Sequence, residues 1–101
     1  MVVNFSIVPI GKESSLSAKV AEVLKIVSES GIDYKLHSMG TILEGDWDEI
    51  MRLIKKCHKI IAKDSDRVLT TITIDDHMGR TGRIAGKVKS VEKKLGKKLK
   101  T

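Results

Sequence analysis

The sequence predicts an α+β fold in which four strands and three helices follow one another in the order β, α, β, β, α, β, α. Apolar residues alternate with polar ones in four short stretches and recur at helical spacing in three longer stretches. Two crossovers and an antiparallel sheet with helices on one side predict a ferredoxin-like sandwich, followed by an extra C-terminal helix. The predicted strands cover 2–10, 33–38, 40–44 and 67–75, and the predicted helices cover about 16–30, 46–63 and 84–101.

The first and last strands are predicted from their side-chain pattern. Segment 67–75 is rich in β-branched residues, which favour strands. Segment 33–44 either turns sharply at Met39-Gly40 or forms one bent strand, and the sequence leaves both open. In the first strand an apolar face alternates with a mixed one, Val3, Phe5 and Ile7 against Asn4, Ser6 and Val8.

The helices are predicted from capping signals and apolar stripes. Asp46 is expected to cap the second helix, with Glu49 in capping-box spacing, and Gly31 is expected to end the first helix. Lys19 is placed on the solvent side of the first helix. The stripes are Val20, Val23, Leu24 and Val27 on the first helix, Ile50, Leu53, Ile54, Cys57 and Ile61 on the second, and Ile84, Val88, Val91 and Leu95 on the last.

Composition limits the function classes. The 101 residues predict a single domain, 1–101, and the net charge of +6 comes from the C-terminal segment. Segment 1–86 holds 12 Lys and Arg against 12 Asp and Glu, whereas 87–101 holds seven Lys and one acid. We favour a solvated lysine face over a nucleic-acid or membrane patch, because the excess charge belongs to the C-terminal helix and not to the domain. The three aromatic residues also make a base-stacking platform for single-stranded nucleic acid unlikely. No apolar run reaches membrane-spanning length, no signal peptide is recognised, and a single cysteine, Cys57, suits a reducing cytoplasm.

A polar cluster gathers where the two middle strands meet. Segment 37–46 places an imidazole, hydroxyls and the Glu44 carboxylate on or beside one predicted hairpin. We expect no enzyme, metal or cofactor, because no nucleophile–base pair, ligand set or phosphate loop is visible. Arg80 and Arg83 flank the start of the last helix, where a bound anion would offset their unfavourable position on the helix dipole.

Three segments together resemble a known family. They are Phe-Ser-Ile-Val-Pro-Ile-Gly at 5–11, Met-Gly-Thr-Ile-Leu-Glu-Gly-Asp at 39–46 and Lys-Val-Lys-Ser-Val-Glu at 87–92. The chain is similar in these segments to the thiamine-binding protein family, the YkoF-like group. The resemblance implies a ferredoxin-like fold, sheet-mediated dimers and tetramers, no catalysis, and thiamine bound as a ligand through its hydroxymethylpyrimidine part.

The chemistry of an aminopyrimidine selects candidate ligand-binding residues. It needs flat apolar walls, an acceptor for its amine and donors for its ring nitrogens. Glu44 is expected as the charged anchor or, alternatively, as a solvated strand end. The expected set is Glu44, Thr41 and Ser6 first, then Asn4, His37 and Ser38, with Met39 as a wall.

Three function classes follow. The first is a small-molecule binding protein for thiamine or its pyrimidine part. The alternatives are a metabolite-sensing regulatory module and an RNA-associated protein using the basic C-terminal helix. The half-apolar open sheet face predicts self-association into a homotetramer, a dimer of dimers, and the stripe from Ile84 to Leu95 predicts that the last helix packs on an edge or a neighbouring subunit.

Overall fold

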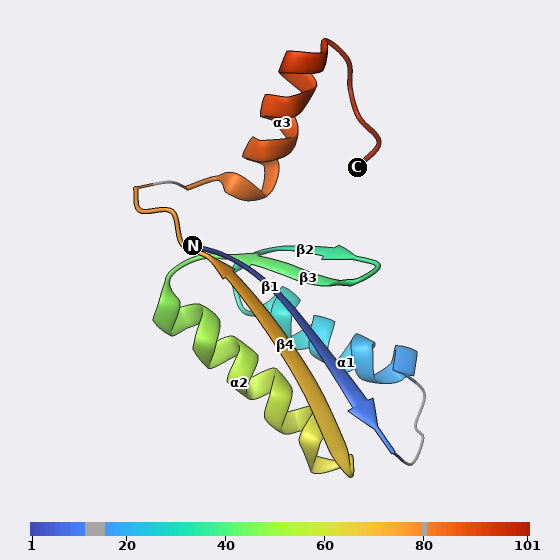
Figure 1. Cartoon of the computed structure of the whole chain (residues 1–101). Helices are drawn as coiled ribbons and strands as arrows, with labels where there is room; N and C mark the ends of the chain where they lie inside the picture. The colour runs from blue at the N-terminus through green and yellow to red at the C-terminus, as the bar shows by residue number, and fades with distance from the viewer. Residues whose placement is uncertain (12–15, 80) are drawn as a thin grey trace.

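The computed structural model describes residues 1–11, 16–79 and 81–101 of the chain. In these residues it has four strands and three helices in the predicted order (Figure 1). The predicted bounds of the first, third and fourth strands agree with the structure. The strands are β1 (Val2–Ile10), β2 (Asp33–His37), β3 (Gly40–Glu44) and β4 (Arg67–Asp75), and the helices are α1 (Leu16–Glu29), α2 (Trp47–Lys63) and α3 (Arg83–Leu95).

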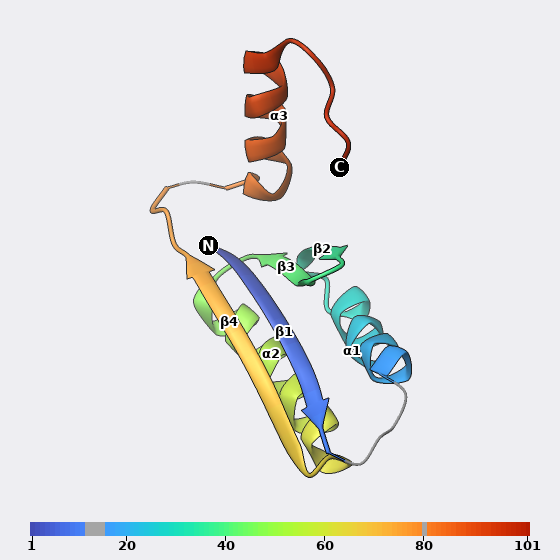
Figure 2. The same ribbon diagram turned by 45° about the vertical axis from the view of Figure 1, so that its right-hand side comes forward.

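The strands form one open antiparallel sheet in the order β2-β3-β1-β4. Helices α1 and α2 lie against one face of this sheet, and the described helices leave the other face uncovered (Figures 1 and 2). The predicted α+β class and the antiparallel strands are therefore confirmed. The strand order is compatible with the ferredoxin-like sandwich that the sequence predicts.

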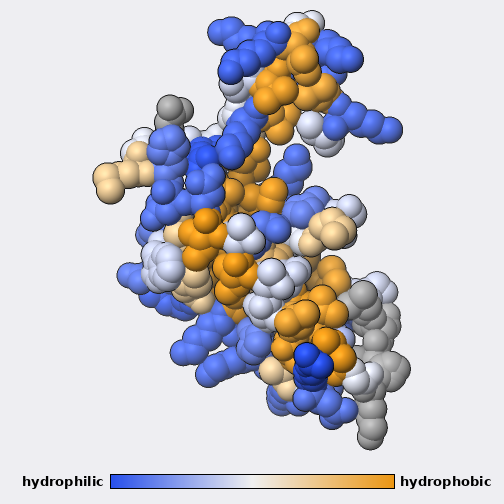
Figure 3. Space-filling model, viewed as in Figure 1, coloured by the Kyte–Doolittle hydropathy of each residue, from blue (hydrophilic) through white to orange (hydrophobic). Residues whose placement is uncertain are grey.

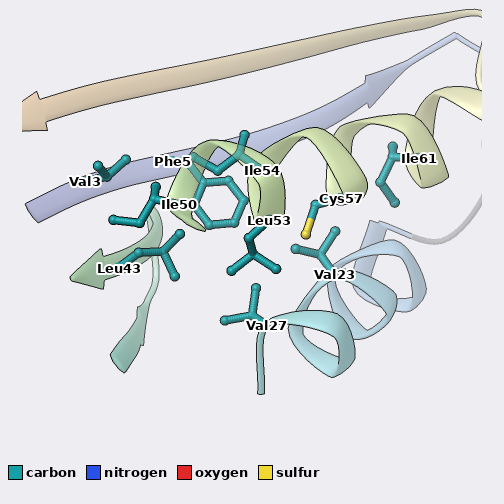
Figure 4. Packing of buried hydrophobic residues seen from close by; sticks show 10 residues of the cluster. All are labelled: Val3, Phe5, Val23, Val27, Leu43, Ile50, Leu53, Ile54, Cys57 and Ile61. Carbon is teal, nitrogen blue, oxygen red and sulfur yellow. The ribbon is translucent and has the colours of Figure 1, made fainter. Parts of the chain in front are cut away.

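The core lies between the sheet and the two helices on its covered face (Figure 4). The predicted stripe of α2 is buried in full, because its five apolar residues recur on one face. The inward residues of β1 and β3 and two valines of α1 form the rest of the core. The core residues are Val3, Phe5, Val23, Val27, Leu43, Ile50, Leu53, Ile54, Cys57 and Ile61.

One side of α1 differs from the prediction. Lys19, expected in solvent, is only 9% exposed, whereas Val20, expected in the core, is 38% exposed. The Lys19 ammonium lies 3.5 Å from a carboxylate oxygen of Asp64, just after α2. The aliphatic stem of Lys19 therefore covers apolar surface while its charged end reaches a partner at the rim. The prediction for Lys19 was wrong, because helical periodicity alone ignores such long side chains.

The predicted start of α2 and the predicted glycine after α1 are confirmed. The Asp46 carboxylate accepts a hydrogen bond of 2.9 Å from the Glu49 N–H at the start of α2, as a capping residue does. Gly31, two residues after α1, has a φ of 81°, which a glycine adopts without steric cost. The β2–β3 connection is a sharp turn, but its central residues are Ser38-Met39, one residue before the predicted Met39-Gly40, because Gly40 already pairs with His37. The alternative of one bent strand is therefore wrong.

Helix α3 extends away from the sheet, and apolar atoms run along it (Figures 1 and 3). None of its residues is buried, and Val91 and Leu95 are 46% and 56% exposed. The helix ends at Leu95 rather than continuing to 101 as predicted. Gly96 follows with a left-handed φ of 71°, and the N–H groups of Gly96 and Lys97 both bond to the carbonyl of Glu92. A glycine in this conformation commonly terminates a helix.

Candidate ligand-binding site

A cavity of about 390 Å³ lies between the β2–β3 turn, the middle of β1 and the middle of α1, and we call it the hairpin cavity. Its volume falls in the range of small-molecule sites, roughly 300–1,000 Å³. Most of its wall is apolar, with hydroxyl and imidazole groups at the turn. The lining residues are Phe5, Ser6, Ile7 and Val8 of β1, Val20, Val23 and Leu24 of α1, and Leu36, His37, Ser38, Met39, Gly40 and Thr41 of the hairpin.

The cavity exists because β1 is longer than its neighbour β3. The pairing of β1 with β3 stops where Phe5 lies opposite Thr41, whereas its pairing with β4 continues to Ile10. From Ser6 onward, one edge of β1 therefore has no strand beside it among the described residues. The hairpin tip and α1 border this uncovered edge, so that a strand end, a turn and a helix face enclose the space.

The N–H and carbonyl groups of successive β1 residues point alternately toward β3 and toward β4, and this alternation decides which backbone groups face the uncovered edge. The Met1 amino group donates to the carbonyl of Gly45 at 2.7 Å, and the Gly45 N–H donates to the carbonyl of Met1 at 3.1 Å. In an antiparallel pair such bonded positions recur at every second residue. The backbone N–H and carbonyl groups of the odd-numbered residues of β1 therefore point toward the β3 side. Ile7 therefore directs its N–H and its carbonyl to the uncovered edge. Pro9, the next such residue, has no N–H to leave unpaired.

The structure brings together five of the seven predicted ligand-binding residues. They line the hairpin cavity and are Ser6, His37, Ser38, Met39 and Thr41. Thr41 is 4% exposed, and Met39 is 79% exposed at the tip of the turn. Asn4 lies outside the lining, and its Oδ1 is 2.9 Å from Nε2 of His37.

The seventh predicted residue, Glu44, lies at the opposite end of β3 from the cavity. One of its carboxylate oxygens accepts hydrogen bonds from the N–H groups of Arg83 (2.8 Å) and Ile84 (3.2 Å) at the start of α3. Glu44 was predicted to be either the charged anchor of the ligand site or a solvated strand end. It does not line the hairpin cavity, and its carboxylate is bonded to α3 rather than free in solvent. The sequence does hold a signal for this role of Glu44. Gly82 occupies the N-cap of α3 and has no side chain to accept a hydrogen bond there, so the first N–H groups of α3 need an acceptor from elsewhere.

The anion site predicted from Arg80 and Arg83 was expected at this same start of α3. Arg83 Nη2 lies 2.7 Å from a carboxylate oxygen of Asp75, and Lys87 lies 3.5 Å from the same oxygen. The hydrogen bond from Arg83 holds the pKa of Asp75 below its ordinary value, and it raises the pKa of Arg83. The Glu44 carboxylate thus occupies the helix N-terminus where an anion was expected. Arg80 lies outside the described residues.

Some cavity residues were not predicted as site residues. Val20, Leu24 and Leu36 were read as core or strand positions, and they form apolar walls of the hairpin cavity. Val20 is 38% exposed and Leu36 is 52% exposed, as expected for residues at an open rim. No group of three or more His, Cys, Asp or Glu side chains suited to a metal occurs in the described part of the chain. No helix in residues 1–11, 16–79 and 81–101 is long and apolar enough to span a membrane.

The fold and the hairpin cavity define a class of small open-faced α+β domains with a ligand-sized hollow beside a hairpin turn. The family model for thiamine-binding proteins matches residues 3–92, and the chain belongs to that family. The UPF0045 protein MJ1052 of Methanocaldococcus jannaschii is 33% identical over 91 residues, which are 90% of this chain and 91% of the relative. The UPF0045 protein YqgV of Bacillus subtilis is 36% identical over 100 residues, 93% of this chain and 96% of the relative.

Solved structures share the fold. The crystal structure of MJ1052 covers 89% of this chain and 93% of its own, with a TM-score of 0.80 and 33% identity. A proposed thiamine biosynthesis/salvage protein of Thermotoga maritima covers 89% of this chain and 96% of its own, with a TM-score of 0.77, and its 23% identity supports the fold alone. The family is named for binding thiamine, and the relatives named here carry no enzymatic name.

Proposed function

We propose that this protein is a non-enzymatic binder of thiamine, or of its hydroxymethylpyrimidine moiety, and that the ligand occupies the hairpin cavity. Membership of the thiamine-binding family supports the choice of ligand. The observation that carries the choice of site is the uncovered edge of β1 at Ile7 beside a hollow of about 390 Å³. No Asp, Glu, Lys or Arg side chain lines this cavity. His37 does line it, and both of its ring nitrogens are engaged by Asn4 and the Met39 N–H, which supports a binding site rather than an acid–base catalytic one.

The backbone of Ile7 offers the complement of an aminopyrimidine edge. Such an edge presents a ring nitrogen, which accepts a hydrogen bond, next to an amino group, which donates one. The N–H and carbonyl of one strand residue supply a donor and an acceptor side by side in the same plane. The hydroxyls of Ser6 and Thr41 lie in the same lining and would serve the remaining polar atoms. The apolar walls from α1 and Leu36 would contact the faces of the flat ring.

The positive charge of the thiazolium ring determines which part of thiamine enters the cavity. Because the lining holds no carboxylate, a cation inside the cavity would lose water without gaining an opposite charge. The pyrimidine part therefore enters the cavity, and the thiazolium stays at its solvent-facing mouth near the exposed Met39. Glu44 is not among the proposed contacts, since it lies at the far end of β3 and is bonded to α3. Free hydroxymethylpyrimidine should then bind within about tenfold of thiamine.

Calorimetric titration with thiamine, its phosphates and free hydroxymethylpyrimidine tests the proposal. Val20→Phe would fill the cavity from its exposed rim with little effect on the core, because Val20 is a lining residue that is 38% exposed. Ala21→Phe adds the same ring at the next exposed position of α1, outside the lining, and is the matched control. Loss of binding in the first variant alone is the expected result. Equal binding by both variants would place the ligand elsewhere.

The two alternative functions predict different outcomes in the same experiments. A metabolite-sensing regulatory module would bind its ligand and then change its assembly or its contacts with a partner, which light scattering with and without ligand detects. An RNA-associated protein would bind RNA through the lysines of α3 with a steep dependence on salt. Saturable thiamine binding that is independent of salt favours the proposed function over the RNA alternative.

We also propose that the chain assembles as a homotetramer, a dimer of dimers. Three exposed surfaces of the described chain support this. The uncovered sheet face carries Val8 and Leu69, 39% and 51% exposed, and α3 has no buried residue. The outer edge of β4 holds nine residues without proline or glycine, and such an edge pairs readily with another strand. A light-scattering mass of one chain at micromolar concentration would contradict the proposal.

A cytoplasmic location completes the proposal. Cys57 is buried in the core, and burial raises the pKa of its thiol to about 11. The thiol is therefore protonated and unreactive at neutral pH, and it needs no disulfide partner. This is the usual state of a lone cysteine in a reducing compartment.

A further inference from the structure

The β2–β3 turn has a backbone conformation that hairpins rarely favour. It is a two-residue connection, Ser38-Met39, between the paired residues His37 and Gly40. The turns that match the twist of a two-residue hairpin require a positive φ at the first or at both central residues. No non-glycine residue of the described chain has a positive φ. Ser38 and Met39 therefore form an unprimed turn, which needs additional stabilisation to hold the two strands in register.

The side chain of His37 supplies a hydrogen bond inside this turn. The Met39 N–H donates to Nδ1 of His37 at 3.2 Å. A side-chain acceptor bonded to the N–H two residues later is the arrangement by which Asn and Asp stabilise turns. A backbone N–H can only donate, so Nδ1 must carry a lone pair. The imidazole is then neutral, and its proton lies on Nε2.

Asn4 fixes the other end of the same ring. Nε2 of His37 lies 2.9 Å from Oδ1 of Asn4 on β1, and with the proton on Nε2 the imidazole donates to the amide oxygen. His37 on β2 and Asn4 on β1 are not on neighbouring strands, because β3 lies between them in the sheet. They meet because His37 is paired with Gly40, which has no side chain. A Cβ at Gly40 would lie 2.8 Å from the Phe5 carbonyl oxygen and 3.1 Å from Asn4 Oδ1.

We infer that Asn4 and His37 are positioning residues that hold the turn, and with it one wall of the hairpin cavity, in its binding geometry. The chain of hydrogen bonds runs from the Met39 N–H to the imidazole and on to the Asn4 amide. The residues from His37 to Gly40 all line the cavity, whereas Asn4 does not. Asn4 thus acts on the site through His37, without contacting the ligand. The effect on ligand affinity rests on the proposed function, but the effect on the turn does not.

The test uses the whole protein and two measurements that need no ligand. The first is the imidazole nitrogen spectrum of His37, which shows which ring nitrogen carries the proton. The second is the hydrogen-exchange rate of the Met39 amide. Asn4→Ala should alter the tautomer signature and speed Met39 exchange by about threefold to tenfold, as expected for the loss of one hydrogen bond. His37→Ala should speed it by at least as much.

Two further variants separate positioning from general destabilisation. Thr73 lies on β4 directly opposite Asn4 and is exposed, so Thr73→Ala truncates a neighbour on the same face without touching the turn. It should leave the His37 spectrum and the Met39 exchange unchanged. His37→Asn keeps an acceptor for the Met39 N–H, so it should preserve more of the protection of that amide than His37→Ala.

The outcomes separate this inference from the proposed function. A wild-type spectrum with the proton on Nδ1, or Met39 exchange unaffected by Asn4→Ala, would overturn the inference even if thiamine binds. Failure of wild type to bind thiamine or hydroxymethylpyrimidine would overturn the proposed function while the turn measurements still hold. When both hold, Asn4→Ala should weaken binding of free hydroxymethylpyrimidine by about the same threefold to tenfold. Unchanged affinity would show that the turn does not position the site.

Discussion

Removing the Glu44 carboxylate should loosen the start of α3 and leave the hairpin cavity intact. The carboxylate accepts two N–H groups, from Arg83 at 2.8 Å and from Ile84 at 3.2 Å. Gly82 at the N-cap offers no replacement. Loss of a capping side chain costs about 0.5–2 kcal/mol, and the partly buried, charged acceptor places Glu44→Ala in the upper half of that range. About 1–2 kcal/mol corresponds to a roughly 5- to 30-fold rise in local opening.

Hydrogen exchange of the α3 amides measures this effect directly. Glu44→Gln keeps one oxygen acceptor and loses the charge that favours the helix dipole, so its effect should be smaller, about 0.3–1 kcal/mol. Glu22→Ala removes an exposed acid from α1 and serves as the control. The reasoning is refuted if Glu44→Ala leaves α3 exchange unchanged. It is also refuted if Glu44→Gln weakens thiamine binding about tenfold, since the carboxylate would then contact the ligand.

Three other perturbations test separate parts of the structure. Val91→Asp places a charge on the exposed stripe of α3 and should lower the fraction of the proposed tetramer in sedimentation, with unchanged circular dichroism from the remaining elements; a tetramer unaltered by this change would contradict a role of α3 in assembly. Acidification should release α3, because the hydrogen bond from Arg83 lowers the pKa of Asp75 below 3.8 in the folded protein. The ion pair therefore stabilises the attachment of α3 fully above pH 3.8, and this stabilisation is lost as the pH falls through the lower pKa of the folded state. Asp75→Asn should reduce this acid-induced rise in α3 exchange, and a rise of unchanged size would assign it to other groups. Gly40→Ala should destabilise the fold by about 1–3 kcal/mol in urea titration, because its Cβ would lie 2.8 Å from the Phe5 carbonyl oxygen; an unchanged midpoint would mean that β1 and β3 can move apart there.

Local signals predicted most of the fold. The alternation in β1 and β4 and the Asp46 cap of α2 depend on neighbouring residues, and their positions agree with the structure. The end of α3 could also have been predicted, since Gly96 is a helix-terminating residue placed inside the proposed helix. The burial of Lys19 could not, because it depends on where Asp64 lies after α2 packs beside α1.

The candidate site was predicted by residue type but not by geometry. Ser6, Thr41 and the turn residues line one cavity because β3 stops opposite Phe5. The unequal lengths of the two strands were visible in the sequence, but the register that leaves Ile7 uncovered was not. Glu44 was grouped with these residues by its closeness in sequence. A strand of five residues separates its ends widely, so the hairpin tip and Glu44 belong to different sites.

The central claim is that the hairpin cavity binds the pyrimidine part of thiamine. Titration of free hydroxymethylpyrimidine into wild type, Val20→Phe and Ala21→Phe by calorimetry tests it most directly, since Val20 lines the cavity and Ala21 does not. The account predicts saturable binding to wild type and Ala21→Phe, and a loss of at least about tenfold in affinity for Val20→Phe. Binding of equal strength by all three proteins, or no binding by wild type, would contradict it.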